Sequence, residues 1–554
     1  MKKHIKNQVL VKIPKSLSSL IALGVAAVSG ISPHYALSSD SQPTLSSEQQ
    51  CTLPNYTLAA HTKISRLVVK FHEGSGIRHR SGAFKAEQAD QYELSGSVSA
   101  LQTGLLSKEI NDLNQKIQTE GYQIQPLFKA KEAALAALKA SGENRTGHQL
   151  ADLRLYYELI HPEKKANYSS VASLLTDINK LQSVEIAYAE PFPELAVVSS
   201  PANPKAPSSE FTPTPNFEGR QRYLDSPPSG IGASDCAWTV PGGRGSGVKI
   251  VDVEMAWNTN HEDMPALFFS YGTPATDSDS LNHGTAVLGE ITAVNNGFGV
   301  TGIINNAKVG YASICSEQSA KSCLNVADAI IHAAEAVGEG GIVLIELQFP
   351  GPKIDSCETS CLKESCGYVP AEYWKGIFHA IQHATTNGVI VVEAGANGSS
   401  NLDDPIYNGY FDRKVQDSGA IVVAGSDPTP GVPACWTNFG SRIDLHGWGS
   451  HVTTLSCMTP EGCQPLFDGG DNDENRSYTA NFSGTSSASP IVVGAAGSAQ
   501  GIARARYGKP LEPLTLRSLL VETGTPQQQP SDKHIGPLPN LCRLIPLIKE
   551  ELKE

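Results

Sequence analysis

From residue 245 onward, short β-branched segments alternate with helical patterns, and this alternation limits the fold more than any other feature. Strand-like segments occur at Val248 to Val253, Lys308 to Ile314, Gly341 to Leu347, Gly388 to Glu393 and Ala420 to Ala424, with helical patterns at Asn325 to Ala336 and Tyr373 to Thr385. Parallel strands need crossover connections, which are usually helices. The sequence therefore predicts an α/β domain over residues 229–554, with a doubly wound, mostly parallel sheet. Functional residues are expected beyond the carboxyl ends of its strands.

A second folded unit is predicted upstream, over residues 60–190. Strands are expected at 64–71, 122–128, 153–160 and 184–189, and helices at 105–117, 131–140 and 171–181. Two βαβ units with one inserted helix are typical of a small ferredoxin-like α/β sandwich. Residues 191–228 carry nine prolines and predict an extended, exposed linker between the two domains.

The N-terminus predicts export. Five lysines and no acidic residue fall within residues 1–15, and an apolar stretch follows at 20–28. A charged region, an apolar region and small residues in that order indicate a secretory signal peptide, placed at residues 1–36. An N-terminal membrane anchor is the alternative, although the stretch is short for a span. The sequence thus predicts a secreted or periplasmic protein with no stable membrane insertion after signal cleavage.

Charge and cysteine content narrow the function classes. With 43 basic and 56 acidic residues the net charge is −13, which gives no basic footprint for nucleic acid. Ten of the 11 cysteines follow the linker, an even number that allows five disulfides in an exported chain. Cys315 with Cys323 and Cys457 with Cys463 are the expected local pairs. A zinc knot at Cys357, Cys361 and Cys366 is the less favoured alternative.

Three motifs fall where strands or turns should end. Asp252 closes a buried strand, His283 lies in Asn-His-Gly-Thr, and Ser486 lies in Phe-Ser-Gly-Thr-Ser-Ser-Ala-Ser-Pro ahead of a small-residue helix. Nucleophilic catalysis by serine needs an adjacent base and an acid that orients the base. The order along the chain, Asp then His then Ser, fits such a triad.

These motifs resemble those of the subtilisin-like serine peptidases over residues 230–525, and residues 64–190 resemble the chaperone propeptide of that family. The resemblance implies that Asp252 orients the histidine, His283 is the general base and Ser486 is the nucleophile. It also implies that Asn397, in Val-Val-Glu-Ala-Gly-Ala-Asn-Gly, is the oxyanion-hole donor.

The sequence departs from the family pattern in two places. Glu254 stands two residues after the expected acid, and near His283 it would favour the imidazolium ion, unless it points away or pairs with a cation. The segment expected to line the first specificity pocket reads Leu347-Gln348-Phe349, where the family usually has Ser-Leu-Gly. These three residues are the candidate substrate-binding residues.

The expected function is that of an exported serine endopeptidase, made as a self-processing proenzyme, which hydrolyses peptide bonds through an acyl-enzyme. Its partners would be protein or peptide substrates and its own propeptide, with no nucleic acid. The chemistry needs no cofactor, although the acidic loop from Asp468 to Asn475 could hold a structural calcium ion. The alternatives are a catalytically silent binding protein on the same fold, and a serine acyltransferase or esterase.

Overall fold

The computed structural model describes residues 56–87, 103–161, 166–198, 213–352, 366–427, 431–456, 465–469, 473–528 and 532–552. The expected signal peptide, Cys51 and the Cys457–Cys463 pair lie outside these ranges. No helix within the described ranges is long and apolar enough to cross a membrane.

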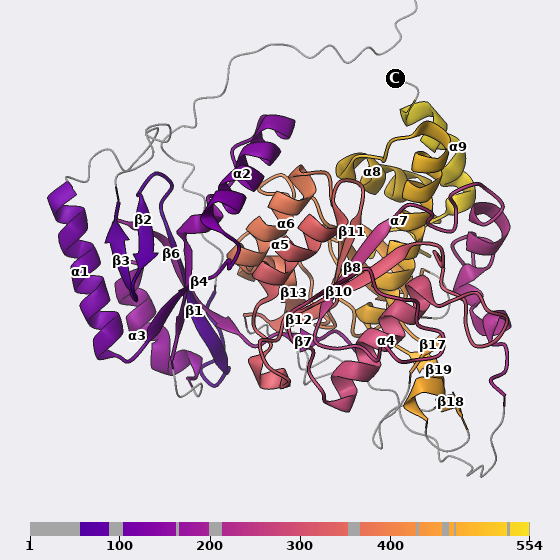
Figure 1. Cartoon of the computed structure of the whole chain (residues 1–554), viewed down its shortest axis with the longest axis horizontal. Helices are drawn as coiled ribbons and strands as arrows, with labels where there is room; N and C mark the ends of the chain where they lie inside the picture. Colours follow the sequence, from indigo (N-terminus) through magenta and orange to yellow (C-terminus); the bar gives the residue numbers. More distant parts are fainter. Residues whose placement is uncertain are drawn as a thin grey trace, which may run out of the picture. The chain divides into compact units, whose positions relative to one another are not determined.

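The N-terminal domain has the predicted ferredoxin-like topology. Its antiparallel sheet runs in the order β4-β5-β1-β6 (Figure 1). The strands are β1 (Ile64–Phe71), β4 (Gln123–Pro126), β5 (Tyr156–Ile160) and β6 (Val184–Pro191), and the helices are α1 (Thr103–Thr119), α2 (Glu132–Thr146) and α3 (Tyr168–Ile178). All eight residues of β1 are buried, so this strand is the centre of the domain core. A hairpin of β2 (Ile77–Arg80) and β3 (Ala83–Ala86) was not expected.

The second domain contains the predicted parallel sheet, in the order β16-β15-β14-β11-β8-β10-β9, and all its strand pairs are parallel. Its strands are β8 (Lys249–Glu254), β9 (Phe269–Tyr271), β10 (Lys308–Ser313), β11 (Ile342–Ile345), β14 (Ile390–Ala394), β15 (Ile421–Ser426) and β16 (Leu445–Trp448). The helices are α4 (Ser278–Thr292), α5 (Val326–Val337), α6 (Lys375–Thr386), α7 (Thr485–Tyr507), α8 (Pro513–Thr523) and α9 (Leu541–Glu551).

Helices cover both faces of this sheet, as a doubly wound fold requires (Figure 1). Successive strand residues point to opposite faces. In β11, Ile342 and Leu344 join the core under α7, whereas Val343 and Ile345 join the core under α5 and α6. Two small antiparallel sheets complete the domain. They are β13-β12-β7, from Tyr368–Pro370, Leu347–Pro350 and Glu194–Leu195, and β17-β19-β18, from Val452–Leu455, Ser477–Phe482 and Pro465–Asp468.

The prediction of an extended, exposed linker at 191–228 is wrong at both ends of the segment. Glu194–Leu195 forms β7, which pairs with β12 of the second domain. Residues 213–228 pack onto that domain, where Tyr223 and Leu224 are buried in the core under α7. The many prolines indicated a segment without regular helices. They could not show that apolar side chains of this segment pack against the second domain. Residues 199–212 lie outside the described ranges.

The N-terminal domain contacts α5 and α6 through polar groups. The Tyr156 hydroxyl lies 2.7 Å from His379 Nδ1, and His383 Nε2 lies 2.8 Å from the carbonyl oxygen of Ala151. The backbone N–H of Lys129 donates to Asp328 at 2.6 Å. These contacts account for the two histidines on α6, whose spacing alone would also suit a metal.

Disulfides tie the second domain together. Cys315 pairs with Cys323, as predicted, and Cys236 pairs with Cys542 on α9. Cys366 and Cys435 are also disulfide-bonded, so the zinc knot is not formed by Cys366.

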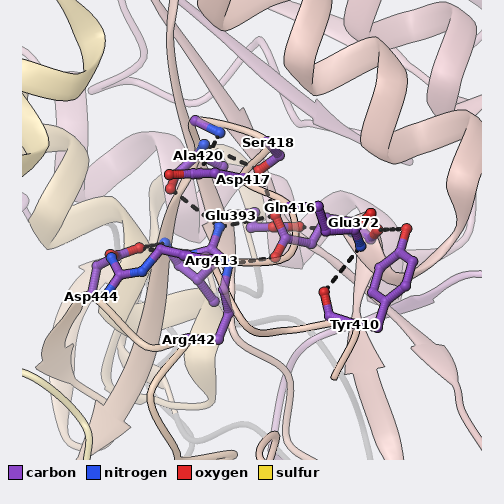
Figure 2. A network of polar contacts seen from close by, with 12 residues as sticks. Glu372, Glu393, Tyr410, Arg413, Gln416, Asp417, Ser418, Ala420, Arg442 and Asp444 are labelled. Carbon is purple, nitrogen blue, oxygen red and sulfur yellow. Dashed lines mark hydrogen bonds and ion pairs between the residues drawn. The ribbon is translucent and has the colours of Figure 1, made fainter. Parts of the chain in front are cut away.

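A buried ion network supports β14 and β15 (Figure 2). Arg442 donates to both carboxylate oxygens of Glu372, at 2.6 and 2.9 Å, and to Asp444 at 2.7 Å. Glu372 in turn donates its backbone N–H to Glu393, near the end of β14. Burial opposes the charge of Glu372, but Arg442 and Ser418 lower its pKa, whereas burial and Glu372 raise the pKa of Glu393. The network thus holds one charged and one protonated glutamate beside β14.

Removing Arg442 should destabilise the protein strongly. Arg442→Met leaves Glu372 and Asp444 buried without their main cation, at an expected cost of about 3–5 kcal/mol. Arg413→Met is the matched control, because Arg413 pairs with the same Asp444 but is partly exposed; its cost should be about 0–1 kcal/mol. Guanidinium unfolding in a Ser486→Ala background, which avoids self-digestion, measures both. Equal losses would show that the network does not depend on Arg442.

Candidate active site

Two neighbouring strands carry carboxyl groups to the same edge of the parallel sheet. Alternation along β8 puts Asp252 and Glu254 on the face that α7 covers, with Glu254 at the carboxyl end. On β11, Leu344 pairs with Asp252, so Glu346 stands beside Glu254, and its N–H donates to the carbonyl of Val253. All three acidic side chains are fully buried. Such a group of carboxyls cannot all be ionised.

His283 donates a hydrogen bond to Glu254. The helix that carries it, α4, begins with Asp277 as the N-cap, whose side chain accepts from the N–H of Ser280. His283 Nδ1 lies 2.6 Å from Glu254 Oε2, and the ring packs edge-on against Phe482, with centroids 5.7 Å apart. Because the carboxylate oxygen accepts, Nδ1 carries the proton and Nε2 has the free lone pair. Burial lowers the pKa of His283 to about 4, against the charge of Asp252, so the neutral ring is the state at neutral pH.

Asp252, the acid expected from the sequence, does not bond to His283. Its carboxyl accepts from Trp257 Nε1 at 2.8 Å. Burial raises the pKa of Asp252, and the charge of Glu254 raises it further; burial also raises the pKa of Glu254. Burial therefore disfavours the charged form of both carboxyls, and the contact with His283 Nδ1 is what distinguishes Glu254 from Asp252. The acid that contacts His283 is therefore Glu254 and not Asp252, the residue expected from the sequence, because the strand continues two residues further and Glu254 reaches α4.

Ser486 lies in the first turn of α7, directly after a tight turn. Gly484 has φ +108°, and a Cβ there would lie 2.3 Å from the carbonyl oxygen of Ala196, so only glycine fits. The first N–H groups of a helix have no partner within the helix. The N–H of Ser486 donates instead to the carbonyl of Ala196, at 3.2 Å. The buried hydroxyl of Ser486 has no hydrogen-bond partner among the described residues.

Asn397 is held with its amide nitrogen free. It follows β14, after Ala396 in a left-handed conformation with φ +71°. Its side-chain oxygen accepts from the N–H of Thr485 at 2.9 Å and from the Thr485 hydroxyl at 3.0 Å. This fixes the amide beside the turn that carries Ser486. The buried Nδ2 finds no partner within the described ranges, so it remains an available donor.

The candidate specificity segment divides into two parts. The side chains of Leu347 and Phe349 are fully buried in the core under α5 and α6, so Leu347 meets β7 through its backbone rather than through its side chain. Gln348 is the residue whose side chain reaches β7: Nε2 donates to the carbonyl of Leu195 at 3.2 Å, and Oε1 accepts from the N–H of Asn397 at 2.9 Å. The strand β12 as a whole forms an edge on which β7 lies antiparallel.

Glu346 was missed in the sequence analysis. Its Oε1 accepts from the hydroxyl of Ser489, one turn along α7 from Ser486, at 2.6 Å. Burial raises its pKa, and the nearby carboxyl of Asp252 raises it further, which disfavours its charged form. Strand alternation would have indicated it, because Glu346 directly follows β11 on the face that carries Leu344.

No group of three or more histidine, cysteine or acidic side chains that could hold a metal occurs among the residues that the structure describes. The acidic loop proposed for calcium, from Asp468 to Asn475, lies partly outside those residues. The expectation of calcium there stays a prediction.

Comparison with known proteins gives the family. The sequence model described as "Subtilase family" matches residues 161–536. Thermitase from Thermoactinomyces vulgaris is 27% identical over 295 residues, which cover 52% of this chain and 85% of thermitase. Subtilisin Savinase from Lederbergia lenta is 26% identical over 255 residues, covering 46% and 76% of the two chains. The alkaline protease of Alkalihalobacillus alcalophilus is also 26% identical, but only 53% of its length is spanned. The structure of fervidolysin from Fervidobacterium pennivorans aligns with a TM-score of 0.49 at 15% identity, covering 74% of this chain and 59% of fervidolysin.

The two acids on β8 should differ in their effect on activity. Glu254→Gln removes the charged acceptor of His283 and should lower the rate of peptide hydrolysis by roughly 10⁴-fold. Asp252→Asn should change it by less than about tenfold, since Asp252 does not contact His283 and an amide can still accept from Trp257. Rates at equal concentrations of folded protein check this. A larger loss for Asp252→Asn than for Glu254→Gln would restore Asp252 as the orienting acid.

Proposed function

We propose that this chain, a serine endopeptidase that belongs to the subtilase family, is exported and is made as a precursor that processes itself. Ser486 is the nucleophile, His283 the general base, Glu254 the acid that orients it and Asn397 the oxyanion donor. The N-terminal domain acts as the propeptide, and other substrates are proteins or peptides. The observation that carries this proposal is a set of three buried groups without partners among the described residues: the hydroxyl of Ser486, Nε2 of His283 and Nδ2 of Asn397.

Each of these groups has a defined task. Because Glu254 accepts from Nδ1, the lone pair of His283 Nε2 is available to take the proton of the Ser486 hydroxyl as it attacks a carbonyl carbon. The tetrahedral oxyanion that forms accepts from the N–H of Ser486 and from Asn397 Nδ2. The imidazolium then gives its proton to the leaving amine, and water hydrolyses the ester. This chemistry needs no cofactor.

The carboxyls around the triad act on the charge of Glu254. Burial raises the pKa of Asp252, Glu254 and Glu346 alike, and Glu254 is the one of the three whose oxygen contacts His283 Nδ1, so we assign the negative charge beside the ring to Glu254. The imidazolium that forms during the reaction is then stabilised by a single carboxylate. The concern that Glu254 would hold the histidine in its charged form is met by burial, which lowers the pKa of His283 to about 4.

Export is supported by the lysine-rich and apolar pattern at residues 1–36. It is also supported by the extracellular protease of Xanthomonas campestris pv. campestris, which is 27% identical over 259 residues, covering 37% of that protein. Disulfide-bonded cysteines agree with an oxidising compartment. Expression with and without residues 1–36 and fractionation of the cells test this point.

Processing should depend on Ser486. Purified wild-type precursor should convert to a shorter mature form, whereas Ser486→Ala should remain at precursor mass, since it lacks the attacking oxygen. Intact-mass measurement over time, with no other protease present, checks this. Conversion of Ser486→Ala at the wild-type rate would contradict self-processing. Labelling of the mature form by a fluorophosphonate separates an endopeptidase from a silent binding protein. Cleavage of casein, rather than of esters alone, separates it from an acyltransferase.

Asn397→Ala should lower kcat by roughly 10²–10³-fold with little change in KM, because the donor acts on charge that exists only in the transition state. Thr485→Val is the matched control: it removes one hydrogen bond to Asn397 but keeps the donor, and should cost less than about tenfold. Kinetics on active-site-titrated protein measure both. A kcat for Asn397→Ala within threefold of wild type would remove Asn397 from the oxyanion hole.

A further inference from the structure

Residues 194–198 lie across the candidate active site in the manner of a substrate. Before the site, β7 pairs antiparallel with β12, with Leu195 opposite Leu347 and Glu194 opposite Gln348. After it, Val197 bridges to Gly484, and the N–H of Val198 donates to the carbonyl of Ser483 at 3.4 Å. Chain on both sides of Ala196 is therefore fixed by backbone hydrogen bonds, which do not depend on side-chain identity.

The carbonyl of Ala196 is the one presented to the reacting groups. It accepts a hydrogen bond from the N–H of Ser486 at 3.2 Å. This N–H is the backbone donor expected to stabilise an oxyanion. Ser486 also carries the attacking hydroxyl, and Asn397 is hydrogen-bonded to Thr485, the residue before Ser486. The Ser486 hydroxyl and Asn397 Nδ2 are both buried and have no partner in the described part of the chain. A carbonyl oxygen that accepts from one of the oxyanion-hole donors places its carbon for attack by the serine that supplies this donor.

We propose that Ala196–Val197 is the peptide bond that the enzyme cleaves in its own precursor; this rests on the proposed function and adds the bond and its residue preference. Ser486 Oγ bonds to the carbonyl carbon of Ala196 and passes its proton to His283 Nε2. The C–N bond to Val197 breaks, and that proton moves to the nitrogen of Val197. Water then splits the Ala196 ester, which leaves a carboxylate at Ala196 and a free amino group at Val197.

The burial of Ala196 sets the residue preference. Its side chain is fully buried, whereas Val197, directly after the bond, is 40% exposed. A longer or charged side chain at 196 has to displace packed atoms or bury a charge, and either shifts the carbonyl from the N–H of Ser486. The site therefore selects a small residue before the cleaved bond, and tolerates variation after it.

The test follows the earliest products of the purified full-length precursor by intact mass and N-terminal sequencing. The first mature form should begin at Val197. Ala196→Arg should slow the first-order conversion by at least about 10²-fold, whereas Ala196→Gly should convert within about tenfold of wild type. Ala202→Arg, which adds the same charge a few residues further along, is the matched control and should convert like wild type.

Three outcomes are distinguishable. Ser486-dependent conversion whose first product begins at another residue overturns the assignment of the bond but leaves the proposed function standing. Conversion of Ala196→Arg at the wild-type rate and at the same bond overturns the residue preference. Conversion of Ser486→Ala in a parallel sample overturns the proposed self-processing itself. N-terminal sequencing of the wild type decides the bond even if Ala196→Arg folds poorly.

Discussion

The hydrogen bond between Glu254 and His283 depends on where one negative charge sits among several buried carboxyls. Asp252, Glu254 and Glu346 share one face of the sheet and lie out of contact with water. Burial raises the pKa of each, so the site can keep a charge only where a partner favours it. The N–H of His283, which donates to Glu254, favours the negative charge on that carboxylate. A related arrangement lies beside β14, where Arg442 lowers the pKa of Glu372 against burial, whereas burial and the charge of Glu372 raise the pKa of Glu393 (Figure 2).

Strand alternation explains both what the sequence could predict and where it failed. Short β-branched segments between helical patterns were enough for the parallel sheet, because burial on both faces leaves a local signal in each segment. The same signal placed His283 and Ser486 at element ends. It could not choose between Asp252 and Glu254, since residues two apart on a strand share a face. That choice depends on how far along β8 the helix α4 lies, which is set by packing between distant segments.

The segment after the N-terminal domain shows a second limit of local patterns. Prolines and polar residues indicated an extended chain, and residues 194–198 are indeed extended, but they are so because they pair with β12 and with the turn at Gly484. An extended backbone has free N–H and C=O groups, and an edge strand provides matching ones. Composition does not reveal such a partner, because the hydrogen bonds are made by backbone atoms and the partner is about 150 to 290 residues away in sequence.

The contacts that hold the N-terminal domain do not include the bond proposed for cleavage. Tyr156 with His379, the carbonyl of Ala151 with His383, and Lys129 with Asp328 all join this domain to α5 and α6. Breaking the chain after Ala196 removes none of them, and it leaves β7 paired with β12. What cleavage does remove is the covalent tether, so a contact that was intramolecular becomes one between two chains and weakens on dilution. Cleavage and release are then separate steps, and the N-terminal domain remains bound to α5 and α6, with β7 paired to β12, until it dissociates.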